Sequence, residues 1–265
     1  MAVVDNILEE EAKHLAQQLF NNDIKKHAAF TSRLIDIYTG ARDKDYLLIH
    51  NPGGWGHTPL EQSLQWERSI VEGVRDKVAE LGYTWWLIQY LRSGHSWRDK
   101  MRDIKEQAVF SVNKARVMAA ELMFIMEHLS HLKVIMIGVS QGAAFGNAVM
   151  REMGASGRVY SIELGIPFPY KSRRVITGNT LTVDGNGLMP DALMEWDVFT
   201  IVKTYLGAPF RWIKYRLQGR PTKFTYCINV PGHDYNWEYP EVQGQIGNFL
   251  KLKFGTKSDV KVVAL

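Results

Sequence analysis

Ser140 lies at the centre of a Gly-x-Ser-x-Gly pattern that spans Gly138 to Gly142. The run Val134 to Ile137, just before it, is apolar throughout, which is typical of a strand covered on both faces. Small residues follow it at a spacing that fits a helix: Ala143, Ala144, Gly146 and Ala148. A strand-to-helix turn this tight strains the serine backbone and tolerates only small residues two positions before and after it. We therefore predict that Ser140 is a nucleophile and that the amide of Gln141, at the helix N-terminus, stabilises an oxyanion. The alternative is a serine that only caps the helix.

The Gly-Val-Ser-Gln-Gly-Ala run of residues 138–143 resembles the nucleophile elbow of the α/β-hydrolase superfamily, in the form found in cutinase-like and lipase-like members. The resemblance covers most of the chain beyond the N-terminal helices. It implies a serine esterase whose base lies late in the chain, between the last strand and the final helix. Phe224 to Val230 is predicted to be that strand and Pro240 to Phe254 that helix. His233 lies between them and is the predicted base, with a structural turn histidine as the alternative.

The imidazole of a serine enzyme needs a carboxylate to orient it. Asp184, at the end of the strand predicted from Asn179, is our first choice for that acid. Asp191 is the runner-up, and Glu163 is a third candidate from the preceding strand. The family usually places its acid a few residues after a glycine and shortly before a proline, whereas Asn186 or Gly187 stands near that position here. An asparagine in the place of the acid would imply low activity.

A glycine-rich loop, Asn51 to His57, follows the predicted buried strand Asp45 to His50. Glycines this dense free the backbone to point its amides at a ligand. In the α/β-hydrolases the corresponding loop donates the second oxyanion amide, so the resemblance implies a donor at Gly53 or Gly54. The alternative is an ordinary glycine-rich turn, and His57 is interpreted as a loop residue rather than the base.

Two further segments are candidates for contact with substrate. Trp55 in the glycine-rich loop, and Arg92 and His95 after the predicted strand Tyr83 to Tyr90, lie where ligands gather at the carboxyl edge of an open sheet. A solvated loop is the alternative for Arg92 and His95. The segment 189–218 is rich in aromatic residues and is predicted to form two helices separated at Gly207-Ala208-Pro209. These helices either cap an apolar pocket or pack on the surface.

The elements that position these residues alternate between strand and helix, which predicts an α/β fold with a doubly wound, mainly parallel sheet of the α/β-hydrolase type. Residues 1–265 are expected to form a single domain, with an N-terminal helical extension over residues 1–40. Helices are further predicted over Leu60 to Leu81 and Trp97 to Leu129, and irregular structure after the strand Arg158 to Leu164.

The composition suits one domain with a sizeable core, at 265 residues, 46% hydrophobic and 23% charged. A net charge of +4 and an isoelectric point near 9.0, with both signs interspersed, argue against a nucleic-acid partner. The single cysteine, Cys227, cannot form an internal disulfide, and the histidines do not cluster at metal-ligand spacing, so no metal or other cofactor is expected. No signal peptide or run of membrane-spanning length is visible, and we expect a cytoplasmic protein with no transmembrane segment.

These patterns together predict a serine hydrolase that cleaves an ester or related acyl bond of an apolar small molecule. Ser140, His233 and Asp184 would form its triad, and Gln141 with Gly53 or Gly54 its oxyanion hole. A catalytically silent protein of the same fold, which binds a hydrophobic ligand or a protein partner, is the alternative from another class. An acyltransferase is the alternative among enzymes.

Overall fold

The computed structural model describes residues 2–21, 23–92, 112–154, 156–220 and 224–258. Its strands are β1 (Tyr46–Asn51), β2 (Trp85–Gln89), β3 (Lys133–Val139), β4 (Val159–Leu164) and β5 (Thr180–Val183). Its α-helices are α1 (Ala2–Phe20), α2 (Ile24–Ala41), α3 (Gln65–Glu80), α5 (Val112–His128), α6 (Gln141–Met153), α7 (Phe168–Lys171), α8 (Val198–Leu217) and α9 (Pro240–Phe254). Two short 3₁₀ helices, η1 (Leu60–Gln62) and η2 (Phe224–Cys227), complete the described elements.

In the described part of the chain the sheet has five strands in the order β2-β1-β3-β4-β5, and every pair is parallel. In the sheet, β2 lies on one side of β1, and β3, the next strand along the chain, lies on the other side of β1. The strand order therefore reverses between β1 and β3, and the carboxyl edge at such a point is where ligands bind in open α/β sheets. The loop after β1 and the turn after β3 meet at this edge.

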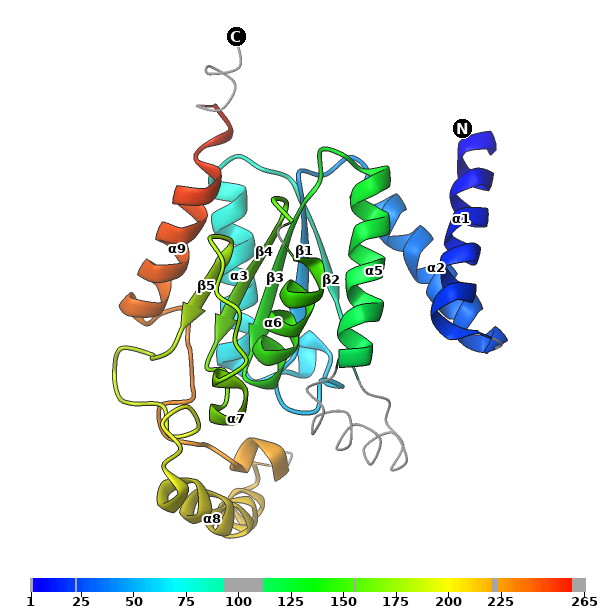
Figure 1. Ribbon diagram of the computed structural model, residues 1–265. Helices are drawn as coiled ribbons and strands as arrows, with labels where there is room; N and C mark the ends of the chain where they lie inside the picture. Colours follow the sequence, from blue (N-terminus) through cyan, green and yellow to red (C-terminus); the bar gives the residue numbers. More distant parts are fainter. Residues whose placement is uncertain (1, 22, 93–111, 155, 221–223, 259–265) are drawn as a thin grey trace.

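The sheet carries helices on both faces (Figure 1). Alternate residues of β1 show the division: Leu47 and Ile49 pack toward α2, α5 and α6, whereas Tyr46 and Leu48 pack toward α3 and α9. All six residues of β1 are buried, as a strand covered on both sides requires. The expected α/β fold with a doubly wound parallel sheet is confirmed, and its strand order fits the α/β-hydrolase type.

The N-terminal extension consists of α1 and α2, which pack against each other, with α2 also against α5. Leu34 and Ile37 of α2 join the core on the α5 side of the sheet. Leu8 of α1 is buried in the same cluster. The predicted N-terminal helical extension is therefore confirmed.

Three segments differ from the sequence predictions. The last strand, predicted over Phe224 to Val230, is the 3₁₀ helix η2 followed by irregular chain, so the sheet ends at β5 in the described residues. The segment after β4, predicted as irregular, contains the single-turn helix α7, which Pro167 precedes as N-cap. α8 is one helix with Pro209 inside it, although proline removes a helical hydrogen bond and two helices were predicted. Of the helix predicted over Trp97 to Leu129, the part before residue 112 lies outside the described residues.

Candidate active site

Ser140 stands between β3 and α6 with φ 54° and ψ −121°. A positive φ is rare for a residue with a Cβ atom and costs on the order of 1–3 kcal/mol, so surrounding contacts must hold it. The amide of Ser140 donates to the carbonyl of Leu164 at 2.8 Å, and its carbonyl accepts from the amide of Ala144 at 3.1 Å. The predicted strand–turn–helix around Ser140 is thus present.

A side chain at either glycine of the pattern would collide with neighbouring backbone atoms. A Cβ atom on Gly138 would lie 2.6 Å from the Cα of Ala143, and one on Gly142 would lie 2.0 Å from the carbonyl oxygen of Asn51. Both neighbours are backbone atoms, which cannot move aside as a flexible side chain can. Gly142 therefore lets α6 approach the loop after β1, and this close approach brings Ser140 to the glycine-rich segment.

His233 is held by Asp191. Its Nδ1 lies 2.7 Å from Oδ2 of Asp191, and because a carboxylate only accepts, Nδ1–H is the donor. This bond leaves Nε2 as the ring nitrogen that can take up a proton. The Asp191 side chain is fully buried and the His233 side chain is 12% exposed, so the pair is screened little by water.

The backbone around the pair fixes its geometry. Gly232 has φ 75°, and a Cβ atom there would lie 2.1 Å from the carbonyl oxygen of Pro190. The amide of Ala192 donates to the carbonyl of Pro231 at 3.1 Å. The segments before His233 and after Pro190 therefore lie against each other, although 42 residues separate Asp191 from His233.

The Asp191 carboxylate has further donors. The hydroxyl of Tyr235 donates to the same Oδ2 at 2.7 Å, and Oδ1 accepts from the amides of Leu193 at 2.9 Å and Met194 at 3.3 Å. Burial, and then the neighbouring Asp191, raise the pKa of Tyr235, which keeps its phenol a neutral donor. Asp191 is thereby fixed in one orientation toward the ring of His233.

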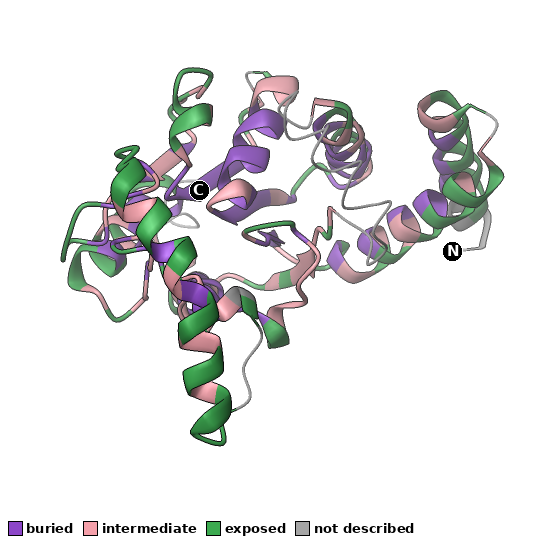
Figure 2. Ribbon diagram, turned by 90° about the horizontal axis from the view of Figure 1, so that it is seen from below, coloured by how far each residue is buried: buried purple, intermediate pink, exposed green. Residues whose placement is uncertain are grey.

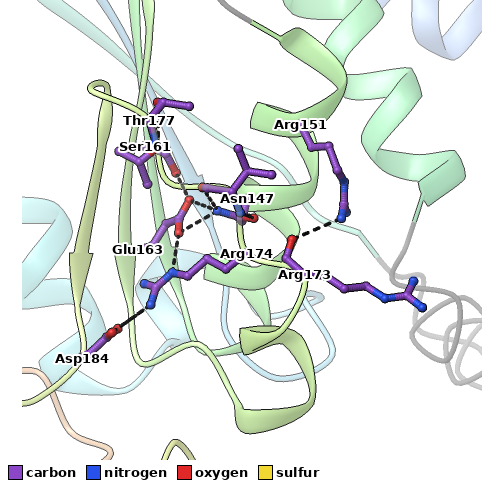
Figure 3. Close-up of polar contacts among 10 residues, drawn as sticks. Asn147, Arg151, Ser161, Glu163, Arg173, Arg174, Thr177 and Asp184 are labelled. Carbon is purple, nitrogen blue, oxygen red and sulfur yellow. Dashed lines mark hydrogen bonds and ion pairs between the residues drawn. The ribbon is translucent and has the colours of Figure 1, made fainter.

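The structure does not bring Asp184, our first choice for the acid, to the ring of His233. The Asp184 carboxylate binds Nη1 of Arg174 at 2.8 and 2.9 Å (Figure 3). The ring of His233 is bound instead by Asp191, the runner-up. The Asp184 side chain is 44% exposed. The strand predicted before Asp184 is present as β5, but the Asp184 side chain forms a salt bridge with Arg174 and not with His233.

Glu163, the third candidate, belongs to the same cluster. It accepts hydrogen bonds from Asn147 at 3.0 Å and from the hydroxyl of Ser161 at 3.0 Å, and lies 3.3 Å from Nε of Arg174 (Figure 3). Burial raises the pKa of Glu163 to about 7. Asn186 does not stand in for the acid either, since its side-chain amide donates to the backbone carbonyl of Asp234 at 3.0 Å.

The glycine-rich loop after β1 is bound by a residue that the sequence did not single out. The amide of Gly53 donates to Oε1 of Glu67 at 2.9 Å, so this predicted oxyanion donor already has a partner. Gly54, the other predicted donor, has φ 54°, which glycine adopts without strain. The amide of Gln141 is at the first position of α6, where a helix has no internal acceptor for it.

Glu67 is itself part of a buried chain of hydrogen bonds. The same Oε1 lies 3.0 Å from Nε2 of His50, and Nδ1 of His50 lies 3.0 Å from Nε2 of Gln89. His50 is fully buried in β1 and Glu67 is 7% exposed in α3. These hydrogen bonds link β2, β1 and α3 to the loop at Gly53. The residues that form them are distant in sequence and share no local motif, so the sequence held no signal for them.

Arg92 joins the two loops of the site. Its Nη2 donates to the carbonyl of Pro52 at 2.5 Å and of Gly54 at 3.2 Å, and Nη1 donates to the carbonyl of Gln141 at 2.7 Å. One guanidinium thus holds the loop after β1 against the start of α6. Arg92 therefore has a structural role and is not a side chain of a solvated loop. Its contact with a substrate stays a prediction. His95 lies outside the described residues.

Ser140 and His233 line one cavity of about 600 Å³, together with Gly53, Gly54, Trp55 and His57. Most of the remaining wall is apolar or aromatic, from Leu64, Trp66, Leu193, Tyr205, Phe224, Tyr226, Ile228 and Val230. Tyr205 comes from α8, and the hydroxyl of Tyr226 donates to the carbonyl of Gln62. A cavity of this size, with a mainly apolar wall and a few polar groups, is typical of a small-molecule site.

Comparison with solved structures finds a cutinase from Trichoderma reesei in complex with a C11Y4 phosphonate inhibitor, at 12% identity and a TM-score of 0.41. The match covers 93% of this chain and 99% of that one. A cutinase-like protein from Cryptococcus sp. matches at 14% identity and a TM-score of 0.42, over 82% of this chain and 98% of the other. No protein-family model and no curated protein sequence matches the chain.

Among the described residues, no three His, Cys, Asp or Glu side chains gather where they could hold a metal ion. None of the described helices combines the length and the apolar character that crossing a membrane requires.

Proposed function

We propose that this protein is a serine hydrolase that cleaves carboxylic esters of apolar small molecules. The observation that carries the proposal is the 2.7 Å contact between Asp191 and His233, whose ring lines the same cavity as Ser140. Nucleophile, acid and base follow one another in the chain in the order Ser, Asp, His, as the nucleophile-elbow enzymes have them.

The three side chains would act in sequence. Nε2 of His233 takes the proton from the hydroxyl of Ser140 as its oxygen attacks the ester carbonyl, and Asp191 stabilises the imidazolium. The tetrahedral intermediate collapses when His233 returns the proton to the leaving alcohol, which leaves an acyl group on Ser140. Water, deprotonated by His233, then adds to the acyl carbonyl, and the acid is released with the Ser140 hydroxyl restored.

The oxyanion of each tetrahedral intermediate needs two donors close to Ser140. We assign the amides of Gln141 and Gly54, because the amide of Gly53 is bound to Glu67. Arg92 supports both donors through the carbonyls of Gln141 and Gly54. Loss of one such donor costs about 2.7–4 kcal/mol of transition-state stabilisation.

The substrate class follows from the wall of the cavity. Aromatic and aliphatic side chains favour an apolar acyl or alcohol group, and among the described residues no Lys or Arg lines the cavity. We therefore propose an uncharged ester with an apolar chain as substrate.

A fluorophosphonate probe tests the proposal directly, since it reacts only with an activated serine. Labelling of the wild type, and none of Ser140→Ala or of His233→Ala, is the expected result, with turnover of a short-chain p-nitrophenyl ester lost in both variants. A folded wild type that takes up no label and hydrolyses no ester would contradict it. That result would favour instead a silent protein that binds an apolar ligand in the same cavity.

A further inference from the structure

The outer side of α8 exposes an unbroken apolar stripe. Its six members recur every three or four residues and are each at least 49% exposed; we call them the α8 outer face: Phe199, Val202, Leu206, Phe210, Ile213 and Leu217. At 100° per residue these positions share one side of the helix. Phe210 is 75% and Leu217 83% exposed. Figure 1 shows α8 at the lower end of the molecule, and most of the helix is exposed in Figure 2. So much apolar surface on one helix marks an interaction site.

The opposite side of α8 anchors the helix to the domain. Thr204 and Ala208 are buried, and η2 is the main neighbour of the helix. Arg211 donates from Nε to the carbonyl of Cys227 at 2.7 Å. The outer face is therefore presented on a helix whose inner side is fixed.

Cations border the α8 outer face. Lys203 and Lys214 are exposed and lie along one edge of this face, each four residues after a phenylalanine (Phe199 and Phe210), and Arg216 lies on the other edge. The twenty residues of α8 contain no Asp or Glu. An apolar stripe bordered by cations is the pattern of a helix that lies in the plane of a lipid surface, where the apolar side chains enter the acyl boundary and the cations meet anionic headgroups.

We propose that the α8 outer face docks the protein on an anionic lipid membrane. A second copy of the chain fits this surface less well, because a two-fold contact between outer faces would bring the lysines of both copies together with no acidic residue of α8 to pair them. Tyr205 of the same helix lines the cavity, so docking would bring the cavity to the lipid surface. This docking goes beyond the proposed esterase activity and does not depend on it.

Vesicle co-sedimentation of the full-length chain, carried out with Ser140→Ala so that no lipid is consumed, tests the proposal. We expect binding to phosphatidylcholine vesicles that contain phosphatidylglycerol, and weaker binding to phosphatidylcholine alone. Phe199→Glu/Phe210→Glu should lower the affinity about a hundredfold, and Lys203→Gln/Lys214→Gln about tenfold on the anionic vesicles only. Leu252→Glu is the matched control: it removes an exposed apolar side chain from α9, 84% exposed, and should bind as the parent does.

Circular dichroism and hydrolysis of a soluble p-nitrophenyl ester, measured with the Ser140 forms of these variants, separate docking from folding and from chemistry. Absence of vesicle binding in the parent chain, or equal binding by the phenylalanine double variant and the control, would overturn the proposal. So would a dimer in light scattering that becomes a monomer in Phe199→Glu/Phe210→Glu, which would make the face a self-interface. A chain that binds vesicles but hydrolyses nothing would overturn the esterase assignment alone.

Discussion

The amide of Gly53 and the carboxylate of Glu67 are joined by a hydrogen bond of 2.9 Å, at the point where the loop after β1 passes Ser140. A Cβ atom built on Gly53 would lie 3.9 Å from the Cβ of Ser140. Glu67 thus fixes the backbone next to the proposed oxyanion donor Gly54. Because His50 binds the same oxygen, the loop is tied to the buried centre of the sheet.

Removal of this tie should impair the proposed catalysis. Glu67→Ala frees the amide of Gly53 and the loop with it, and we expect kcat for a p-nitrophenyl ester to fall about tenfold to a hundredfold. Glu67→Gln keeps an oxygen acceptor and should retain most of kcat. Glu72→Ala, on an exposed position of the same helix, is the control. Equal kcat in Glu67→Ala and the control would show that the loop needs no such support.

Asp191 should be the acid that the proposed triad requires. Asp191→Asn removes the carboxylate that fixes the Nδ1–H tautomer of His233, so we expect kcat to fall by roughly 10⁴-fold. Asp184→Asn changes the carboxylate bound to Arg174 in the same way and should leave kcat within about twofold. The comparison uses the same ester and a circular dichroism check. A large loss in Asp184→Asn with full activity in Asp191→Asn would reverse the assignment.

The nucleophile turn could be predicted from sequence because its causes are local. Gly138 and Gly142 lie within two residues of Ser140, and the strand and helix on either side have their own patterns. His233 was predicted in the same way, from a glycine beside it and a helix after it, although the strand predicted before it is absent from the described residues. A neighbouring backbone segment, Pro190 to Asp191, holds that turn in place of a sheet hydrogen-bond ladder.

The carboxylate that binds His233 could not be chosen from sequence because it depends on contacts between distant segments. Arg174 binds Asp184, and Tyr235 and His233 bind Asp191, and none of these pairs has a fixed spacing that a pattern would reveal. One local signal was present: Asp191 begins a turn in which its side chain accepts the amides two and three residues on. Such an Asp is held in place by its own backbone, whereas Asp184 is not.

Gly142 should be irreplaceable for the fold as well as for the site. A Cβ atom there meets the carbonyl oxygens of Asn51 at 2.0 Å and Pro52 at 2.6 Å, so Gly142→Ala must push α6 away from the loop after β1. We expect a loss of about 3 kcal/mol in the free energy of unfolding, measured in urea. Gly244→Ala in α9 meets nothing within 4 Å and should stabilise the protein by up to about 1 kcal/mol. A stable Gly142→Ala would contradict the close approach of α6.

The buried carboxyl of Glu163 should make stability depend on pH. Burial raises the pKa of Glu163 in the folded protein to about 7, against 4.5 for its ordinary value. Between these values the folded state binds a proton that the unfolded state releases, so this contribution to stability is complete below about pH 4.5 and is lost as the pH rises toward 7. The expected loss across that range is about 3 kcal/mol.

Urea unfolding at about pH 5 and about pH 8 measures this dependence, and Glu163→Gln identifies its source. The glutamine stays neutral, so the difference in unfolding free energy between the two conditions should shrink by about 2.5 kcal/mol relative to the wild type. Ser161→Ala removes one hydrogen bond to the carboxylate but keeps the titrating group, and it should preserve the difference. If Glu163→Gln and Ser161→Ala changed the pH dependence equally, the proton would belong to another group, and the cluster of Asn147, Glu163 and Arg174 would be held by a carboxylate ionised throughout this range.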